Sequence, residues 1–234
     1  MSNQAEFNFY HINDRASGEF NSPETPYYVH EEAKKIFYVM LFKDPVTRAC
    51  LNIIRVIANP YTTQEAHITI RGPYRGSDIL YHRRSWKDKH DEAAVVIDGC
   101  GRFNFRDEHV VYLSSSNRSF TEDIWWKPDY QDGVLHITLY NGRDEKMADY
   151  LHKMLSHSEI GFKSRLTKLT PMSSRDKSQQ DFAVYLAIEG KYIQKTVGMD
   201  LRLEDIYHLS FHSRARIIDR VWTYLLKHKS RSRL

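Results

Sequence analysis

EAHITIRGPY at residues 65–74 and GVLHITLYNG at residues 133–142 contain the same four-residue pattern. In both, a histidine is followed by isoleucine, threonine and an aliphatic residue: HITI at 67–70 and HITL at 136–139. Successive side chains of a β-strand point to opposite faces of the sheet. Each segment therefore predicts a strand with a histidine and a threonine on one face and two buried aliphatic side chains on the other.

The repeated pattern has two interpretations. Either the two strands meet and place both histidines and both threonines at one site, or they are unrelated edge strands in which threonine reflects β-propensity. A single histidine–threonine pair has little meaning in a chain with 12 histidines. Two copies within the same strand pattern favour a shared site.

The segments before the first copy predict a strand followed by a helix. The continuous apolar run IFYVMLF at residues 36–42 is typical of a central buried strand. Asp44 and Pro45 predict a helix start, because Asp is a good N-cap and Pro suits the first turn. Asn59-Pro60 predicts its end. Six apolar residues of this helix have the spacing that places them on one face. They are Val46, Ala49, Cys50, Ile53, Val56 and Ile57.

The segments around the second copy predict strands and a second amphipathic helix. Strands are expected at residues 93–99, 101–105, 109–115 and 161–169, with Gly99 and Gly101 marking a turn or bulge. Asn141-Gly142 is expected to end the second histidine–threonine strand. A helix is expected to begin near Asp144, with an apolar face made of Met147, Tyr150, Leu151, Met154 and Leu155.

At the two His-x-Thr sequences the chain resembles the 2H phosphoesterase superfamily, which includes 2′-5′ RNA ligase-like proteins and cyclic nucleotide phosphodiesterases. That family is named for two His-x-Thr/Ser motifs, and residues 67–69 and 136–138 match both. Elsewhere the resemblance is one of layout, over roughly residues 36–170. It implies an α+β fold of two pseudo-symmetric lobes, each with a β-sheet and a packed helix, and an active-site cleft between them.

The resemblance also implies a reaction. It makes His67 and His136 the general acid and base of a metal-independent phosphodiesterase without cofactors, and it makes Thr69 and Thr138 phosphate ligands. The implied substrates are 2′,3′-cyclic phosphates, cyclic mono- or dinucleotides and 2′-5′ oligonucleotides or RNA. Imidazole suits both proton transfers, because its ordinary pKa is about 6.5. Which histidine is the acid depends on the orientation of the substrate.

Further residues near the motifs are candidates for substrate binding. Arg71 and Tyr140 each follow a motif threonine by two places, so they are expected on the same strand face as phosphate and base-stacking contacts; plain packing is the alternative for the tyrosine. Tyr74 is expected in the adjoining turn, and one of Trp125 and Trp126 can stack on a base. The sequence contains neither HExxH nor CxxC, so no metal site is expected.

A basic stretch follows the first motif within the loop expected at residues 72–92. The net charge of +4 is mild, but basic residues gather at Arg71, Arg75, Arg83, Arg84, Lys87 and Lys89. Such groups attract a phosphate-bearing substrate, or they form an ordinary solvated loop. They would serve equally in the alternative function, a catalytically inactive 2H fold that binds nucleotide, RNA or a protein partner.

The chain is expected to divide into three parts. Residues 1–30 are expected to form an N-terminal arm or lid, and residues 31–170 are expected to form the bilobal domain. Residues 171–234 are expected to form a mainly helical extension that begins with a polar linker at 171–180. The apolar stripe of the extension must be buried against the lobes or against a second subunit in a homo-oligomer. Its residues are Ile206, Leu209, Ile217, Val221 and Leu225.

A third His-x-Ser sequence, at residues 208–210, lies in this extension. The helical period around it predicts that His208 and Ser210 lie within a helix and do not share a face. It is therefore not expected to belong to the site.

Composition fits a soluble globular protein with no expected membrane span. The 234 residues are 41% hydrophobic and 27% charged, and no apolar run approaches 18 residues. The N-terminal residues do not form a secretory signal. Cys50 and Cys100 are too few and too far apart for a disulfide framework, and the expected compartment is the cytoplasm.

Overall fold

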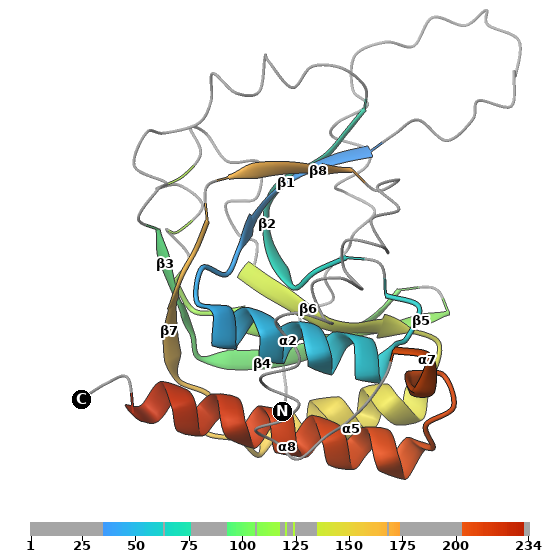
Figure 1. Cartoon of the computed structure of the whole chain (residues 1–234). Coiled ribbons are helices and arrows are strands. Elements are labelled where there is room, and N and C mark those ends of the chain that lie inside the picture. The colour runs from blue at the N-terminus through green and yellow to red at the C-terminus, as the bar shows by residue number, and fades with distance from the viewer. Residues whose placement is uncertain are drawn as a thin grey trace, which may run out of the picture. The chain divides into compact units, whose positions relative to one another are not determined.

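A computed structural model of the chain describes residues 35–62, 64–75, 93–105, 107–117, 120, 124, 135–167, 169–173 and 203–231. The predicted N-terminal arm, residues 76–92 of the predicted loop, and both Trp125 and Trp126 lie outside the described residues. The described residues all belong to one compact unit, residues 34–234. They form a mixed fold of helices and three small antiparallel sheets (Figure 1).

The apolar run at residues 36–42 forms the central strand of the first sheet, as predicted. This strand, β1 (Lys35–Leu41), lies between β2 (His67–Arg75) and β8 (Thr170–Ser173). Tyr38 and Met40 are completely buried. A central strand is covered on both sides, which explains the lack of polar alternation in its sequence.

Two predicted loops begin later than the sequence suggested. Residues 72–75 continue β2, where Tyr74 pairs with Ile36, so Tyr74 does not lie in a turn. Residues 171–173, predicted as the start of a linker, belong to β8 and pair with β1. Both segments contain a proline or a glycine, which suggested a break, but their pairing with β1 overrides that local signal.

The other two sheets contain the remaining strands. β3 (Ala94–Ile97) pairs with β7 (Phe162–Arg165), and β4 (Gly99–Phe105), β5 (Glu108–Ser115) and β6 (Leu135–Gly142) form the third sheet in that order. The predicted strand at residues 161–169 is confirmed in its first half, where Phe162 is buried and Lys163 is exposed. β6 ends at Gly142, so the strand ends at the Asn141-Gly142 pair, as predicted.

Gly99 is the first residue of β4, after the break between β3 and β4 at Asp98, whereas Gly101 lies inside β4 and marks neither a turn nor a bulge. An added Cβ at Gly101 would overlap the phenol ring of Tyr112 on the neighbouring strand β5. The glycine is therefore needed for the close approach of an aromatic ring across the sheet.

Helix α2 (Pro45–Ala58) begins and ends as predicted. The carboxylate of Asp44 accepts hydrogen bonds from the backbone N–H groups of Val46 (2.9 Å) and Thr47 (3.2 Å), and Asn59 is the C-cap. The prediction of a single apolar face is incomplete, since Leu51 and Ile54 on the remaining surface are also fully buried. Within the described residues, helix α8 and strand β6 both pack against α2.

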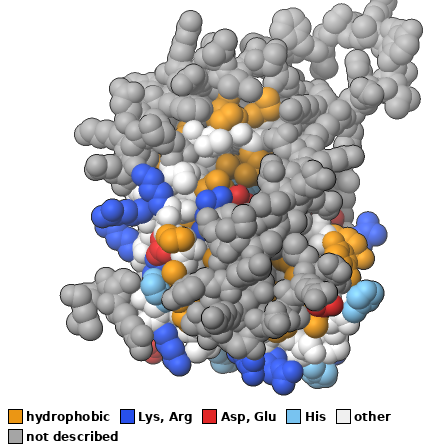
Figure 2. Space-filling model, in the orientation of Figure 1, with side chains coloured by type: hydrophobic (Ala, Val, Ile, Leu, Met, Phe, Trp, Pro, Cys, Tyr) orange, Lys and Arg blue, Asp and Glu red, His pale blue; other side chains and the backbone are white. Residues whose placement is uncertain are grey.

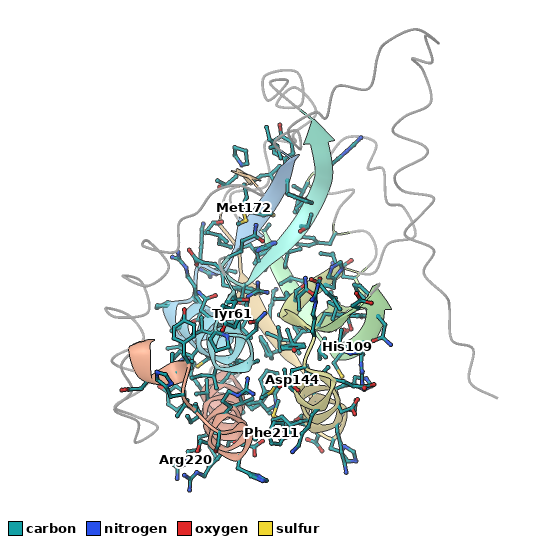
Figure 3. The ribbon with its side chains drawn as sticks, turned by 90° about the vertical axis from the view of Figure 1, so that its right-hand side faces the viewer. Tyr61, His109, Asp144, Met172, Phe211 and Arg220 are labelled. Atoms are coloured by element: carbon teal, nitrogen blue, oxygen red, sulfur yellow. The ribbon has the colours of Figure 1, made fainter. Side chains whose placement is uncertain are left out.

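Helix α8 (Phe211–Arg231) packs against α2, against α5 (Glu145–Ser156) and against β7. Figure 1 shows it below α2, with α5 beside it, and Figure 3 shows Phe211 between α8 and α5. Trp222 is 3% exposed and donates its indole N–H to Ser158 Oγ at 2.9 Å. The predicted apolar stripe is thus covered within the chain and needs no second subunit to bury it.

Two basic side chains of α8 reach the N-caps of the other helices. Lys229 pairs with Asp44, and Arg214 lies 3.2 Å from the carboxylate of Asp144, the N-cap of α5. Arg214 also donates to the carbonyl of Ala58 at the C-terminal end of α2 (3.3 Å). These contacts tie α8 to the ends of both helices, so it is an integral part of the fold.

The prediction of continuous helix around His208 is wrong. A short helix, α7 (Leu203–Ile206), ends before it, and α8 begins only at Phe211. Ser210 Oγ accepts a hydrogen bond from the backbone N–H of Ser213 (3.2 Å), as an N-cap residue does. The serine of the third His-x-Ser sequence therefore caps α8, and His208 lies exposed in the preceding turn.

The outer face of α8 is basic and exposed. Figure 2 shows Lys and Arg side chains along the lower edge of the view, where α8 lies in Figure 1, and Figure 3 shows Arg220 pointing away from the protein. Within the described residues, no helix is both long enough and apolar enough to cross a membrane.

Candidate active site at the two His-x-Thr strands

The two His-x-Thr sequences form strands β2 and β6, called here the motif strands, and their faces alternate as predicted. Ile68 and Ile137 are at most 1% exposed. The two histidines and two threonines of the motifs, His67, Thr69, His136 and Thr138, are all partly exposed. The aliphatic residues therefore anchor each strand in the core, while the polar residues lie on the opposite face.

Both motif strands carry a β-bulge at the same place. In the first sheet Val39 pairs with Thr69 but Tyr38 pairs with Arg71, so Ile70 is the extra residue. In the third sheet Tyr112 pairs with Thr138 but Val111 pairs with Tyr140, so the extra residue directly follows the threonine again. Bulges redirect side chains and often lie beside active sites. The likeness between the two segments thus extends from sequence to backbone register.

The structure brings the two motif strands together, although they belong to different sheets. Each is an edge strand of its sheet among the described residues, and β2 and β6 pack against each other. Arg55 of α2 donates hydrogen bonds to the carbonyl of Gln64, just before β2, at 3.2 Å and to the carbonyl of Thr138 in β6. His136 is close enough to His67 to lower its pKa.

The environment of His67 favours a neutral ring in a single tautomer. Its Nδ1 lies 2.7 Å from the carbonyl of Glu65, which only accepts, so Nδ1 carries the hydrogen and Nε2 carries the lone pair. Burial lowers the pKa of His67 to about 4, assisted by the charge of Arg55 and opposed by the hydrogen bond to Glu65. The ring of His67 is therefore neutral at neutral pH, with its lone pair on Nε2.

A polar row on α2 holds the segment that leads into His67. Arg48 forms a bidentate pair with the carboxylate of Glu65 at 2.7 and 2.9 Å. Asn52, completely buried, accepts a hydrogen bond from the N–H of Ala66 at 2.7 Å. Sequence analysis missed these residues and Arg55. The available signal was their spacing, which places positions 48, 52 and 55 on one side of a helix otherwise buried by apolar residues.

His136 lies among aromatic rings on the face of the third sheet. The ring of Tyr112 makes an edge contact with it, with centroids 5.4 Å apart, and Phe103 makes a second at 6.5 Å. Burial raises the pKa of the Tyr112 phenol. Sequence analysis missed both aromatic residues, because only the pairing of β4, β5 and β6 shows that they face the motif.

Tyr140 does not occupy the position predicted for a base-stacking residue. The bulge interrupts the alternation of β6, and Leu139 and Tyr140 are both buried, the tyrosine being 3% exposed. Its hydroxyl accepts a hydrogen bond from the N–H of Asp144 (2.9 Å) and donates to the carbonyl of the same residue (3.1 Å). Plain packing, with a role in fixing the start of α5, is the better account.

The Tyr140→Phe variant is therefore expected to lose stability but keep its activity. Removing the hydroxyl takes away its two hydrogen bonds to the part-buried backbone of Asp144, and losing one such bond typically lowers the free energy of unfolding by about 0.5–1.5 kcal/mol. Urea unfolding followed by circular dichroism measures this change. If Tyr140 instead stacked on a base, the phenyl ring of Tyr140→Phe would still do so and the stability would not change. An unaltered unfolding curve would therefore contradict the structural role of the Tyr140 hydroxyl.

The other two residues predicted near the first motif as substrate contacts, Arg71 and Tyr74, both lie in β2. Arg71 lies in β2 directly after the bulge, pairs with Tyr38, and is partly exposed. Tyr74 lies in the same strand, opposite Ile36. Of the predicted basic cluster only Arg71 and Arg75 fall within described segments. Arg71 thus remains a candidate phosphate contact close to the first motif.

Within the described segments, no group of three or more His, Cys, Asp or Glu side chains is placed to hold a metal ion. The groups available for chemistry at the motif strands are imidazoles, hydroxyls and guanidinium ions. The described residues therefore define a mixed α and β protein in which two strands with matching His-x-Thr sequences pack against each other. No family model, curated protein or solved structure matches the chain.

Proposed function

We propose that this protein is a metal-independent phosphodiesterase of the 2H type, with His67, His136, Thr69 and Thr138 as its catalytic residues. The observation that carries the proposal is the meeting of the two motif strands, which have the same sequence pattern, the same edge position and the same bulge. A chance repeat of four residues has no reason to share all three.

Two imidazoles supply what cleavage of a phosphodiester requires. One accepts the proton of the attacking water or ribose hydroxyl, and the other donates a proton to the leaving oxygen; each transfer contributes typically about 10²–10⁴ in rate. In this proposal the hydroxyls of Thr69 and Thr138 hydrogen-bond the non-bridging oxygens, and Arg71 adds a positive charge.

The proposed architecture is bilobal. One lobe is the sheet of β1, β2 and β8 with α2, and the other is the sheet of β4, β5 and β6 with α5. In both, the motif strand is the edge strand and lies beside a central strand, β1 or β5. This arrangement supports a cleft between the lobes, with one His-x-Thr pair on each side.

The substrate class we propose is a nucleotide or RNA that contains a 2′,3′-cyclic phosphate, a cyclic mono- or dinucleotide bond or a 2′-5′ linkage. The test is cleavage of such a panel by the purified full chain, with the His67→Ala variant as control and products separated by chromatography. Turnover of one member that the variant lacks supports the proposal. Binding of a panel member without any cleavage would instead make the protein a nucleotide- or RNA-binding 2H fold.

Activity is expected to be retained in excess EDTA, because the proposed chemistry uses only side chains of the chain itself. Turnover with EDTA should match turnover with added Mg²⁺, Mn²⁺ or Zn²⁺ within about two-fold, well below the effect of losing a catalytic metal. Parallel assays of the chelated and metal-supplemented protein measure this. Loss of activity in EDTA with rescue by one divalent ion would indicate a metallophosphodiesterase.

A further inference from the structure

Arg55 is a buried cation in the region where the two motif strands are joined. Its side chain is on α2 and only 6% of the residue is exposed. Burial lowers its pKa to about 10, so it stays charged at neutral pH. Within the described part of the chain, its hydrogen bonds go to backbone carbonyls, Gln64 before the first motif and Thr138 inside the second.

A charged side chain in this position needs a physical reason. Burying a charge is costly unless the charge is paired or hydrogen-bonded. A guanidinium, however, has donors in a rigid planar fork and can bind two acceptors that belong to different segments. At Arg55, one of these segments is the residue just before the first motif strand, β2, and the other is the second motif strand, β6.

We propose, building on the proposed function, that Arg55 is a positioning residue that ties the two motif strands together and makes His67 the proton acceptor of the pair. Arg55 itself does not touch the reacting atoms. It acts through the carbonyls that it binds and through its charge.

The surroundings of His67 leave Arg55 as the main fixed charge acting on it. From β6 the neighbouring titratable group is His136, and on β1 the paired residue is the apolar Leu41. The nearby carboxylate of Glu65 is engaged by Arg48 and Asn52. Burial and the charge of Arg55 therefore both favour the neutral ring, and the carbonyl of Glu65 fixes the hydrogen on Nδ1.

The roles of the two histidines follow. His67 Nε2 takes the proton of the attacking water or hydroxyl as that oxygen forms its bond to phosphorus. The bond from phosphorus to the leaving oxygen breaks, and this oxygen takes a proton from His136. Each turnover leaves a proton on His67 and removes one from His136, and exchange with solvent restores both.

The experiment is an NMR pH titration of the His67 ring in the full chain, with the signal assigned from a His67→Asn variant. In Arg55→Gln the guanidinium charge is lost, so the pKa of His67 should rise from about 4 towards 6.5. The acidic limb of the pH–rate profile should move to higher pH. As the pH is lowered, a base of higher pKa becomes protonated, and so inactive, at a higher pH. Arg220→Gln removes an exposed cation from the outer face of α8 and should leave the titration unchanged.

Arg55→Lys separates positioning from charge, and it serves also if Arg55→Gln fails to fold. Lysine keeps the charge but lacks the planar fork, so the pKa of His67 should stay low while turnover falls at least about ten-fold. Unchanged turnover in folded Arg55→Lys would overturn the positioning role. An unchanged His67 titration in folded Arg55→Gln would overturn the electrostatic role.

The experiments distinguish failure of the inference about Arg55 from failure of the proposed function. If the wild-type chain cleaves no phosphodiester but the His67 titration shifts in Arg55→Gln, the proposed activity is wrong and the influence of Arg55 on His67 stands. If cleavage occurs and neither Arg55 variant alters the titration, the pH profile or turnover, the inference about Arg55 is wrong and the activity stands.

Discussion

Replacing either His67 or His136 with alanine is expected to lower turnover by at least about 10², because each substitution removes one proton-transfer group. Both rings lie on the polar face of a motif strand, and they lie near each other. The double variant is expected to be little worse than either single variant, since residues that act in one step have non-additive effects. Single-turnover assays on a cleaved substrate, with binding measured separately, test this prediction.

His208→Ala is the matched control for this experiment. His208 also stands two places before a hydroxyl residue, but it lies exposed in the turn before α8, where Ser210 caps the helix. Its replacement should change turnover by no more than a few-fold. A folded His208→Ala protein with a loss of several orders of magnitude would mean that the motifs are paired incorrectly. Near-full activity in His67→Ala or His136→Ala would contradict the proposed active site.

Ending the chain after Ser210, and so removing α8, is expected to abolish the folded state. Four large side chains of this helix are at most 3% exposed: Ile218, Val221, Trp222 and Leu225. Truncating one buried side chain of this kind to alanine costs about 2–5 kcal/mol. Four such losses amount to about 8–20 kcal/mol, which is as large as the whole 5–15 kcal/mol that typically separates folded from unfolded domains. The truncation also removes the helix that packs against α2, α5 and β7.

Point substitutions in α8 provide a graded form of the same test. Leu225→Ala is expected to lower the free energy of unfolding by about 2–5 kcal/mol. Thr223→Ala changes an exposed position of the same helix and should stay within about 0.5 kcal/mol. Urea unfolding followed by circular dichroism measures both. A soluble truncated chain that still unfolds cooperatively would contradict the view that α8 is part of the core.

This expectation differs from what the sequence alone suggests for the C-terminal region. If residues 171–234 were only an extension, their removal would affect solubility or assembly more than chemistry. In the structure β8 begins at Thr170 and completes the sheet of the first motif strand, and α8 packs on the helix that carries Arg55. Damage to this region therefore reaches the site through α2 and β1.

Local features of the fold were predictable because they depend on neighbouring residues. The alternation of both motif strands follows from the two-residue period of a β-strand. The starts of α2 and α5 at Asp44 and Asp144 follow from the hydrogen bonds that an aspartate offers to the first turn. The burial of β1 follows from an apolar run too short for most helices. These predictions needed no knowledge of which segments meet.

Tertiary structure decided the features that depend on distant residues. The bulge after each motif threonine shifts the pairing by one residue, and this shift buries Tyr140 instead of placing it beside Thr138. A one-residue change of register moves a side chain to the other face of the sheet, and the local sequence pattern did not reveal it.

The sequence by itself thus determined which residues each motif strand presents, because the period of a strand is a local property. Only the tertiary structure decided that the two edge strands pack together and that Arg55 joins them. Gln64 and Thr138 are far apart in the sequence, and their carbonyls reach one guanidinium only when β6 and the residues before β2 both lie beside α2. That packing depends on the burial of the whole core, including α8, and no short segment of sequence specifies it.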